Sequence, residues 1–204
     1  MFLDELPEFD RRVLEVLREP MESGSITISR AARQAEFPAR FQLITAMNPC
    51  PCGHLGDNSS HSCRCTSEQV SRYRQRISGP LLDRIDIHIE VPRVPPQLLQ
   101  QTAVNNSEES KTVRNRVQAA RNIQLQRGGV PNSALGSREV EQFCRLDTVS
   151  MRLVHRAMEQ LGLSARAYHR ILKLARTIAD LDRQEQINSS HLGEAIGYRR
   201  LDRN

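Results

Sequence analysis

The first six residues, MFLDEL (Met1 to Leu6), decide how the rest of the chain is interpreted. Apolar residues run directly into Asp4 and Glu5, an order typical of a buried parallel strand whose carboxyl end faces a ligand crevice. The apolar run is short for such a strand, so we expect the strand to begin before Met1. The two carboxylates suit nucleotide hydrolysis, because the first can hold Mg²⁺ and the second can polarise water. Alone, the pair equally fits solvated acids at the end of a strand.

The next predicted elements are a helix and a hairpin. Asp10 is placed to cap a helix that we expect Pro20 to Gly24 to end. The alternating residues Ser25 to Ser29 predict the first strand of a hairpin, which turns at Arg30 to Arg33 and returns through Phe37 and Pro38.

Two more strands and a helix complete the predicted α/β part. Phe41 to Met47 has the pattern of a second buried strand, which ends at Asn48. A helix is predicted over residues 67–77, and Ile85 to Val91 alternates as a strand does. An asparagine after a strand can also cap the following turn, so Asn48 alone indicates no function.

The second half of the chain has helical patterns. Apolar residues recur at helical spacing after Ser164, which is placed as an N-cap, and a shorter helix is predicted near Ser189. Prolines and a polar run predict a linker over residues 96–110. We therefore expect an α/β domain over residues 1–95 and an all-helical domain over residues 111–204.

Four of the five cysteines lie in one polar insert, residues 49–66. After Cys50 and Cys52, ten residues intervene before Cys63 and Cys65, and four thiolates in a compact loop are typical ligands of tetrahedral Zn²⁺. Because the CxC spacing is unusually tight for a structural zinc site, free thiols stay an alternative. Two histidines are possible substitute ligands and the fifth cysteine is expected to pack in a helix; these are His54, His61 and Cys144.

Composition favours a protein of the cytoplasm. The chain has 204 residues, a net charge of +5, and no apolar run approaching the roughly 18 residues of a membrane span. Clustered cysteines in a reducing compartment favour metal ligation over disulfides. The modest positive charge permits a nucleic-acid or nucleotide partner.

Three stretches together resemble the magnesium-chelatase-like AAA+ ATPases of the ComM/YifB family. They are FLDELPEFDRRVLEVLREPMESGSITISRA, FPARFQLITAMNPCPCG and SGPLLDRIDIHIEV, and LSARAYHRILKLARTIADL in the helical part extends the match. The resemblance implies the distal half of an AAA+ parallel-sheet nucleotide-binding domain with a zinc-binding insert, followed by a helical lid. It also implies ATP and Mg²⁺ as cofactors, a homo-oligomeric ring such as a hexamer, and DNA as a partner.

The same resemblance implies a role for several residues. Asp4 would hold magnesium and Glu5 would act on water as the Walker B pair, while Asn48 would be sensor 1. Arg84 would be an arginine finger that acts on a neighbouring subunit, although an exposed pair with Asp83 or Asp86 is the simpler alternative. Arg166, in the first turn of the Ser164 helix, would contact phosphate as sensor 2.

Two arginines at the hairpin turn, Arg30 and Arg33, lie where this family carries a hairpin that can follow a nucleic-acid backbone. Solvated charges are the alternative interpretation for this pair.

The chain departs from the family pattern in one respect, because its 204 residues contain no GxxxxGK[ST] phosphate loop. We therefore expect a partial AAA+ module that is inactive as an ATPase alone. In intact form it would be an ATP-driven motor on DNA, serving competence, recombination or branch migration as a helicase does. The alternative is a non-catalytic, zinc-stabilised module that binds protein or nucleic acid.

Overall fold

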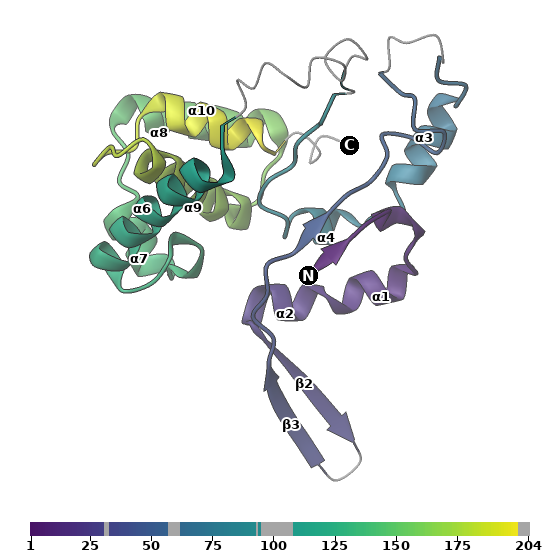
Figure 1. Ribbon diagram of the computed structural model, residues 1–204, viewed down its shortest axis with the longest axis horizontal. Helices are drawn as coiled ribbons and strands as arrows, with labels where there is room; N and C mark the ends of the chain where they lie inside the picture. Colours follow the sequence, from purple (N-terminus) through teal and green to yellow (C-terminus); the bar gives the residue numbers. More distant parts are fainter. Residues whose placement is uncertain (31–32, 57–61, 93, 95–107, 200–204) are drawn as a thin grey trace. The chain divides into compact units, whose positions relative to one another are not determined.

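The computed structural model describes residues 1–30, 33–56, 62–92, 94 and 108–199 (Figure 1). These residues form two compact units, Met1–Ile85 and Asp86–Asn204. Most of the predicted linker, residues 96–107, lies outside the described residues.

The first unit mixes strands and helices, as predicted for an α/β fold. Its elements, in chain order, are β1 (Phe2–Leu3), the 3-10 helix η1 (Leu6–Glu8), α1 (Arg11–Val16), α2 (Arg18–Ser23), β2 (Ser25–Arg30), β3 (Arg33–Pro38), β4 (Ile44–Thr45), α3 (Ser67–Arg74) and α4 (Gly79–Leu82). A small apolar core, formed by Leu6, Leu14, Ile77 and Leu81, joins the 3-10 helix and α1 to the segment around α4.

The two predicted buried strands do pair, in parallel, with Phe2 opposite Ile44 and Leu3 opposite Thr45. Each is only two residues long, and Phe2 and Ile44 are 62% and 54% exposed, so the prediction that they are buried is wrong for this chain. The reason is geometric, because a two-stranded sheet leaves its outer edges and faces open.

The predicted hairpin is present, and it extends away from α1 and α2 (Figure 1). β2 and β3 pair antiparallel from Ser25 opposite Pro38 to Arg30 opposite Arg33. The exposed faces of β3 leave the hairpin without a core of its own, so its backbone ladder holds it together.

The N-cap prediction for Asp10 is confirmed, since its carboxylate accepts a hydrogen bond from the Arg12 backbone N–H at 2.7 Å. The helix end predicted within Pro20 to Gly24 is confirmed, although the helical stretch is divided into α1 and α2. Pro20 lies in the first turn of α2, where its missing N–H would have no helical partner anyway. α2 ends at Gly24, whose φ of 72° is the left-handed conformation that glycine adopts without strain.

The predicted strand Ile85 to Val91 does not form. These residues are described without helix or strand, and the His88 backbone N–H donates to the Tyr198 carbonyl instead. An alternating segment becomes a strand only when a second strand satisfies its backbone hydrogen bonds. The predicted helix over residues 67–77 is also shorter, ending at Arg74.

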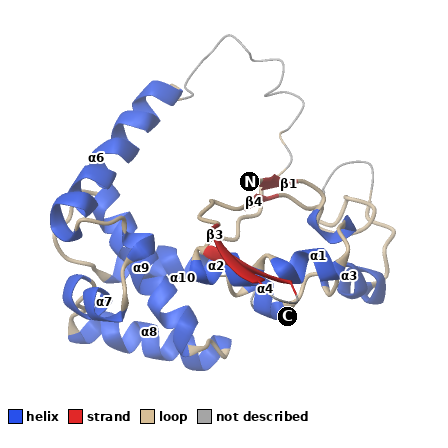
Figure 2. Cartoon of the chain, turned by 90° about the horizontal axis from the view of Figure 1, so that it is seen from below, coloured by secondary structure: helices blue, strands red, loops and turns tan. Residues whose placement is uncertain are grey.

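The described part of the second unit contains helices and no strand, with its elements clustered in Figure 2. They are α6 (Ser110–Gly128), the 3-10 helix η2 (Asn132–Ala134), α7 (Ser137–Phe143), α8 (Thr148–Leu161), α9 (Ala165–Leu181) and α10 (Ser189–Gly197). The Ser164 hydroxyl caps α9 by accepting from the Ala167 N–H, which confirms the predicted start. Cys144 is buried among this unit's apolar residues, as expected.

A buried ionic network links α6, η2 and α9 in the second unit. The Asp180 carboxylate, 1% exposed, accepts two hydrogen bonds of 2.7 Å from Arg127. It accepts further bonds from Asn132 and Arg176. This network positions the helix that begins at Ser164.

Among the helices described, there is no helix with the length and apolarity needed to cross a membrane.

Candidate nucleotide and metal sites

The parallel strand pair brings Asp4 and Glu5 to the same edge as the residues before Asn48. The Ala46 N–H donates to the Leu3 carbonyl and the Leu6 N–H donates to the Ala46 carbonyl, each at 3.0 Å. Both strands therefore end together, with the acidic pair directly after one and Asn48 three residues after Thr45 of the other. Carboxylate oxygens are the ligands that Mg²⁺ prefers, so the exposed Asp4 and Glu5 fit that ion.

Glu5 has a left-handed backbone, with φ 52° and ψ 46°. This conformation costs a residue with a side chain about 1–2 kcal/mol. Both backbone polar groups of Glu5 form hydrogen bonds that hold this conformation. Its N–H donates to the Asp4 carboxylate at 2.9 Å, and its carbonyl accepts from the Glu8 N–H at 2.8 Å. Strained residues of this kind cluster at functional sites.

Tyr73 on α3 is a residue that the sequence interpretation missed. Its side chain is only 8% exposed, and burial raises the pKa of its hydroxyl, while a hydrogen bond with the backbone of Asn48 opposes that rise. A helix pattern gives no sign that α3 lies against a segment 25 residues earlier in the chain. The neighbouring Arg74 makes the same crossing, since its Nη2 donates to the Pro49 carbonyl at 3.4 Å.

Arg84 lies just after α4, and its side chain is 9% exposed. Its Nη2 donates to Glu22 of α2 at 2.5 Å and its Nη1 donates to the Pro80 carbonyl at 2.8 Å. Asp83 and Asp86 are the exposed partners predicted from the sequence, and Glu22, 62 residues away in the chain, is not among them. Asp86 pairs with Arg170 within the second unit.

Arg166 lies in the first turn of α9, as predicted, and is exposed. The N-terminus of a helix is a favourable place for an anion, because backbone N–H groups and the helix dipole face it. Arg166 belongs to the second unit, whereas the other predicted nucleotide residues, Asp4, Glu5, Asn48 and Arg84, belong to the first.

Arg30 of β2 and Arg33 of β3 lie opposite each other and form the last residue pair before the hairpin turn. Arg33 is exposed, and the side chain of Arg30 lies outside the described part of the structure.

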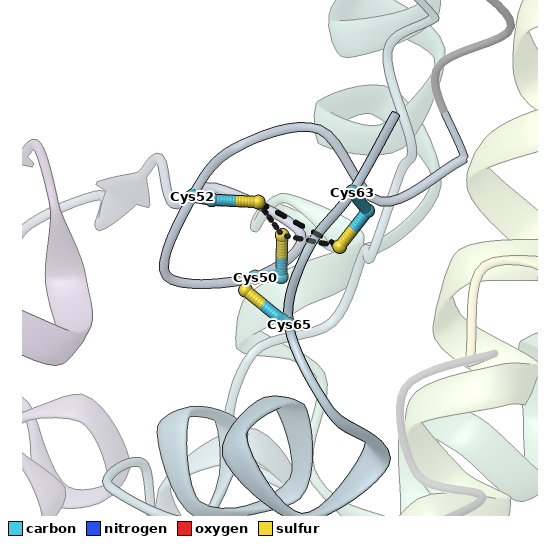
Figure 3. Close-up of side chains that lie close together, drawn as sticks. All are labelled: Cys50, Cys52, Cys63 and Cys65. Carbon is cyan, nitrogen blue, oxygen red and sulfur yellow. Dashed lines mark hydrogen bonds between the residues drawn. The ribbon is translucent and has the colours of Figure 1, made fainter. Parts of the chain in front are cut away.

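The four cysteines of the insert come together (Figure 3). Their Sγ atoms all lie within 4.8 Å of one another, with Cys50 3.4 Å from Cys52 and 3.7 Å from Cys63, and Cys52 3.6 Å from Cys63. A tetrahedral zinc ion with Zn–S bonds of about 2.3 Å requires sulfur separations of about 3.8 Å. A disulfide requires about 2.05 Å, so the cluster has the spacing of a metal site.

The backbone around the insert favours thiolate at one of these cysteines. Hydrogen bonds with the backbone of His54 and then Arg64 lower the pKa of Cys52 to about 6. Metal ions bind the thiolate form. Among the described residues, the group of ligand atoms contains these four sulfurs and no histidine, and His61 lies outside the described residues. The donor set therefore fits zinc, whose structural sites are commonly formed by four cysteines.

Two family models match this chain, and between them they cover nearly all of it. Residues 1–99 match the model described as "Magnesium chelatase, subunit ChlI", and residues 107–199 match "Magnesium chelatase, subunit ChlI C-terminal". The α/β unit with its parallel strands and the helical unit agree with a magnesium-chelatase-like AAA+ protein. The chain belongs to the magnesium-chelatase-like family, in its ComM/YifB group.

Individual relatives support that group. The chain is 51% identical to competence protein ComM of Haemophilus influenzae and 50% identical to uncharacterized protein YifB of Escherichia coli, in each case over 100% of this chain. An uncharacterized protein of Mycobacterium tuberculosis is 32% identical over 98% of it. The chain spans 39% of the length of each of these relatives.

Proposed function

We propose that Asp4, Glu5 and Asn48 form one side of an ATP-hydrolysing site in a longer protein. The observation that carries this proposal is the shared strand edge, where the parallel pair β1–β4 ends beside all three residues. Asp4 would hold Mg²⁺, which neutralises charge on the phosphates. Glu5 would orient and deprotonate the attacking water, and the Asn48 amide would position it near the γ-phosphate.

Two arginines would complete the site from elsewhere. Arg84 would leave Glu22 to stabilise the transferring phosphoryl group of a neighbouring subunit, which requires a homo-oligomeric ring. Arg166 would contribute from the helical unit, at the start of α9. A hexamer is the assembly that we propose for the ring.

DNA is the substrate that we propose for the motor. The support is the extended β2–β3 hairpin with arginines at its tip, because a basic protrusion can follow a phosphate backbone. ATP-driven movement of this hairpin would let the protein act as a helicase or branch-migration motor. One relative carries the name competence protein ComM, and competence, recombination or branch migration is the process in which we propose that this chain works.

The cysteine cluster supports a second function, a structural zinc site. Zinc would join the Cys50–Cys52 turn to Cys63 and Cys65, closing the insert between β4 and α3. Such a site could also stabilise a binding module without turnover, so the catalytic proposal needs its own test.

ATP turnover decides between the catalytic and the binding function. The 204-residue chain contains no GxxxxGK[ST], so we expect no phosphate release above background from this chain alone. A longer form of the protein that carries a phosphate loop before Met1 should hydrolyse ATP, and its Glu5→Gln variant should lose turnover while keeping nucleotide binding. A complete protein that binds ATP and DNA without any turnover would favour the binding module.

A further inference from the structure

The β2–β3 hairpin is joined to α2 without an intervening loop. α2 ends at Ser23, and Gly24 alone separates it from the first hairpin residue, Ser25. The Ser25 N–H donates to Ser23 Oγ at 3.2 Å, and the same hydroxyl lies 2.8 Å from the Ser25 carbonyl oxygen. The last turn of α2 and the start of β2 are therefore bonded to each other across the left-handed Gly24.

The returning arm of the hairpin is attached at the same place. The Ala39 N–H, directly after β3, donates to the Gly24 carbonyl at 2.8 Å. The Arg40 side chain packs against Gly24, since a Cβ added there would lie 3.1 Å from Arg40 Cγ. Each six-residue strand reaches roughly 20 Å from this base. Because both arms meet the end of α2, a displacement of the hairpin is passed to that helix.

Glu22, in the last turn of α2, binds the arginine proposed as the finger. Its Oε2 accepts from Arg84 Nη2 at 2.5 Å, while the Pro80 carbonyl accepts from Arg84 Nη1 at 2.8 Å. The Arg84 side chain is only 9% exposed in this arrangement. An arginine held in this way must leave Glu22 before it can reach a neighbouring subunit. Glu22 itself lies three residues before the hairpin begins.

We propose that Glu22 is a positioning residue that holds Arg84 within its own subunit until DNA displaces the hairpin. Phosphates bound at the hairpin tip move both arms and, with them, the last turn of α2, which separates Glu22 from Arg84. DNA therefore favours the released state of Arg84, and release of Arg84 strengthens DNA binding by the same factor. The inference rests on the proposed function and adds its regulation, in which turnover rises when DNA occupies the hairpin.

The first test measures DNA affinity without ATP. The 204-residue chain is titrated into a fluorescent single-stranded oligonucleotide, whose anisotropy reports binding. Glu22→Gln and Arg84→Ala should each tighten binding roughly two- to fivefold, because each breaks the ion pair that opposes displacement of the hairpin. The double variant should gain nothing further. The two substitutions change the net charge in opposite directions, so attraction to phosphate alone predicts tighter binding for Glu22→Gln and weaker binding for Arg84→Ala.

Glu19→Gln is the matched control for the charge, because it removes an exposed carboxylate one turn earlier on the same helix. Its affinity should stay within roughly twofold of the parent. Any result other than tighter binding in both Glu22→Gln and Arg84→Ala, or an equal gain in Glu19→Gln, would overturn the inference and leave DNA as the proposed partner. A parent chain that does not bind the oligonucleotide would overturn both.

The second test uses ATP and a longer form of the protein that carries a phosphate loop. Glu22→Gln should raise phosphate release in the absence of DNA roughly two- to fivefold, and DNA should then stimulate it less by a similar factor. Glu19→Gln should change neither rate. An unchanged DNA-free rate in Glu22→Gln would overturn the inference. A parent without turnover would instead contradict the proposed function, and the affinity measurement then decides whether the hairpin and Arg84 are coupled.

Discussion

The guanidinium of Arg84 is bound within its own chain, with its Nη2 2.5 Å from Glu22 Oε2 on α2. The residue proposed to reach a neighbouring subunit is therefore also positioned to hold α2 against the segment after α4. These two roles predict different responses to mutation of the partner.

Mutation of Arg84 in the complete protein should abolish turnover. Arg84→Ala should reduce kcat by about 10³-fold or more while nucleotide binding persists, because the residue acts on charge that develops in a neighbouring site. Mixtures of Arg84→Ala and Glu5→Gln subunits should recover activity, since one interface can then combine an intact finger with an intact Walker B pair. No recovery in mixtures shown to co-assemble would contradict action in trans.

Mutation of Glu22 separates the finger from a structural pair. Glu22→Gln should leave turnover within a few-fold of the parent if Arg84 acts by leaving this partner. Steady-state phosphate release measures both variants, with Arg116→Ala, which breaks an exposed pair with Glu108, as the control. Equal loss in Glu22→Gln and Arg84→Ala would assign the arginine to the structural pair.

Zinc content should follow the clustered cysteines and not the separate one. We expect about one zinc per chain by elemental analysis, and its loss from the double variant Cys63→Ser/Cys65→Ser. Cys144→Ala should retain the metal, because Cys144 is buried in the helical unit, where burial raises its pKa to about 11. A metal-free parent chain, purified under reducing and zinc-replete conditions, would rule the site out.

Because the backbone of Glu5 is left-handed, replacement of this residue by glycine should raise stability and abolish turnover. Glu5→Gly should stabilise the first unit by up to about 1 kcal/mol, because glycine adopts φ 52° without steric strain. The same change should abolish ATP turnover in the complete protein. Glu8→Gly, one turn further on in a 3-10 helix, should be destabilising. Urea unfolding compares the variants, and a destabilised Glu5→Gly would show that its side chain contributes more than the strain costs.

Removal of the buried Asp180 carboxylate should unfold the helical unit more easily. Asp180→Ala leaves Arg127 and Arg176 without their shared partner, so we expect a loss of about 3–5 kcal/mol. Asp182→Asn, whose parent side chain is 61% exposed, should change stability by less than about 1 kcal/mol. Similar losses in both variants, measured by urea unfolding, would contradict a buried network.

Sequence patterns correctly predicted the helix caps and the hairpin, whose formation depends on residues only a few positions apart. The N-caps Asp10 and Ser164 and the β2–β3 hairpin were predicted and are confirmed, because capping and tight strand pairing are decided within a few residues. The helix end predicted within Pro20 to Gly24 is also confirmed, at Gly24, because glycine adopts the left-handed C-cap conformation without strain.

The sequence by itself determined the family, the acidic pair after a strand, and the cysteines that come together. Only the tertiary structure decided what those residues touch. It left the segment Ile85 to Val91 without strand pairing, placed Glu22 against Arg84, and brought Arg74 to Pro49. Such contacts join residues far apart in the chain, and their geometry depends on how whole elements pack. A periodic pattern reports which side of an element is apolar, but not which distant side chain will meet it.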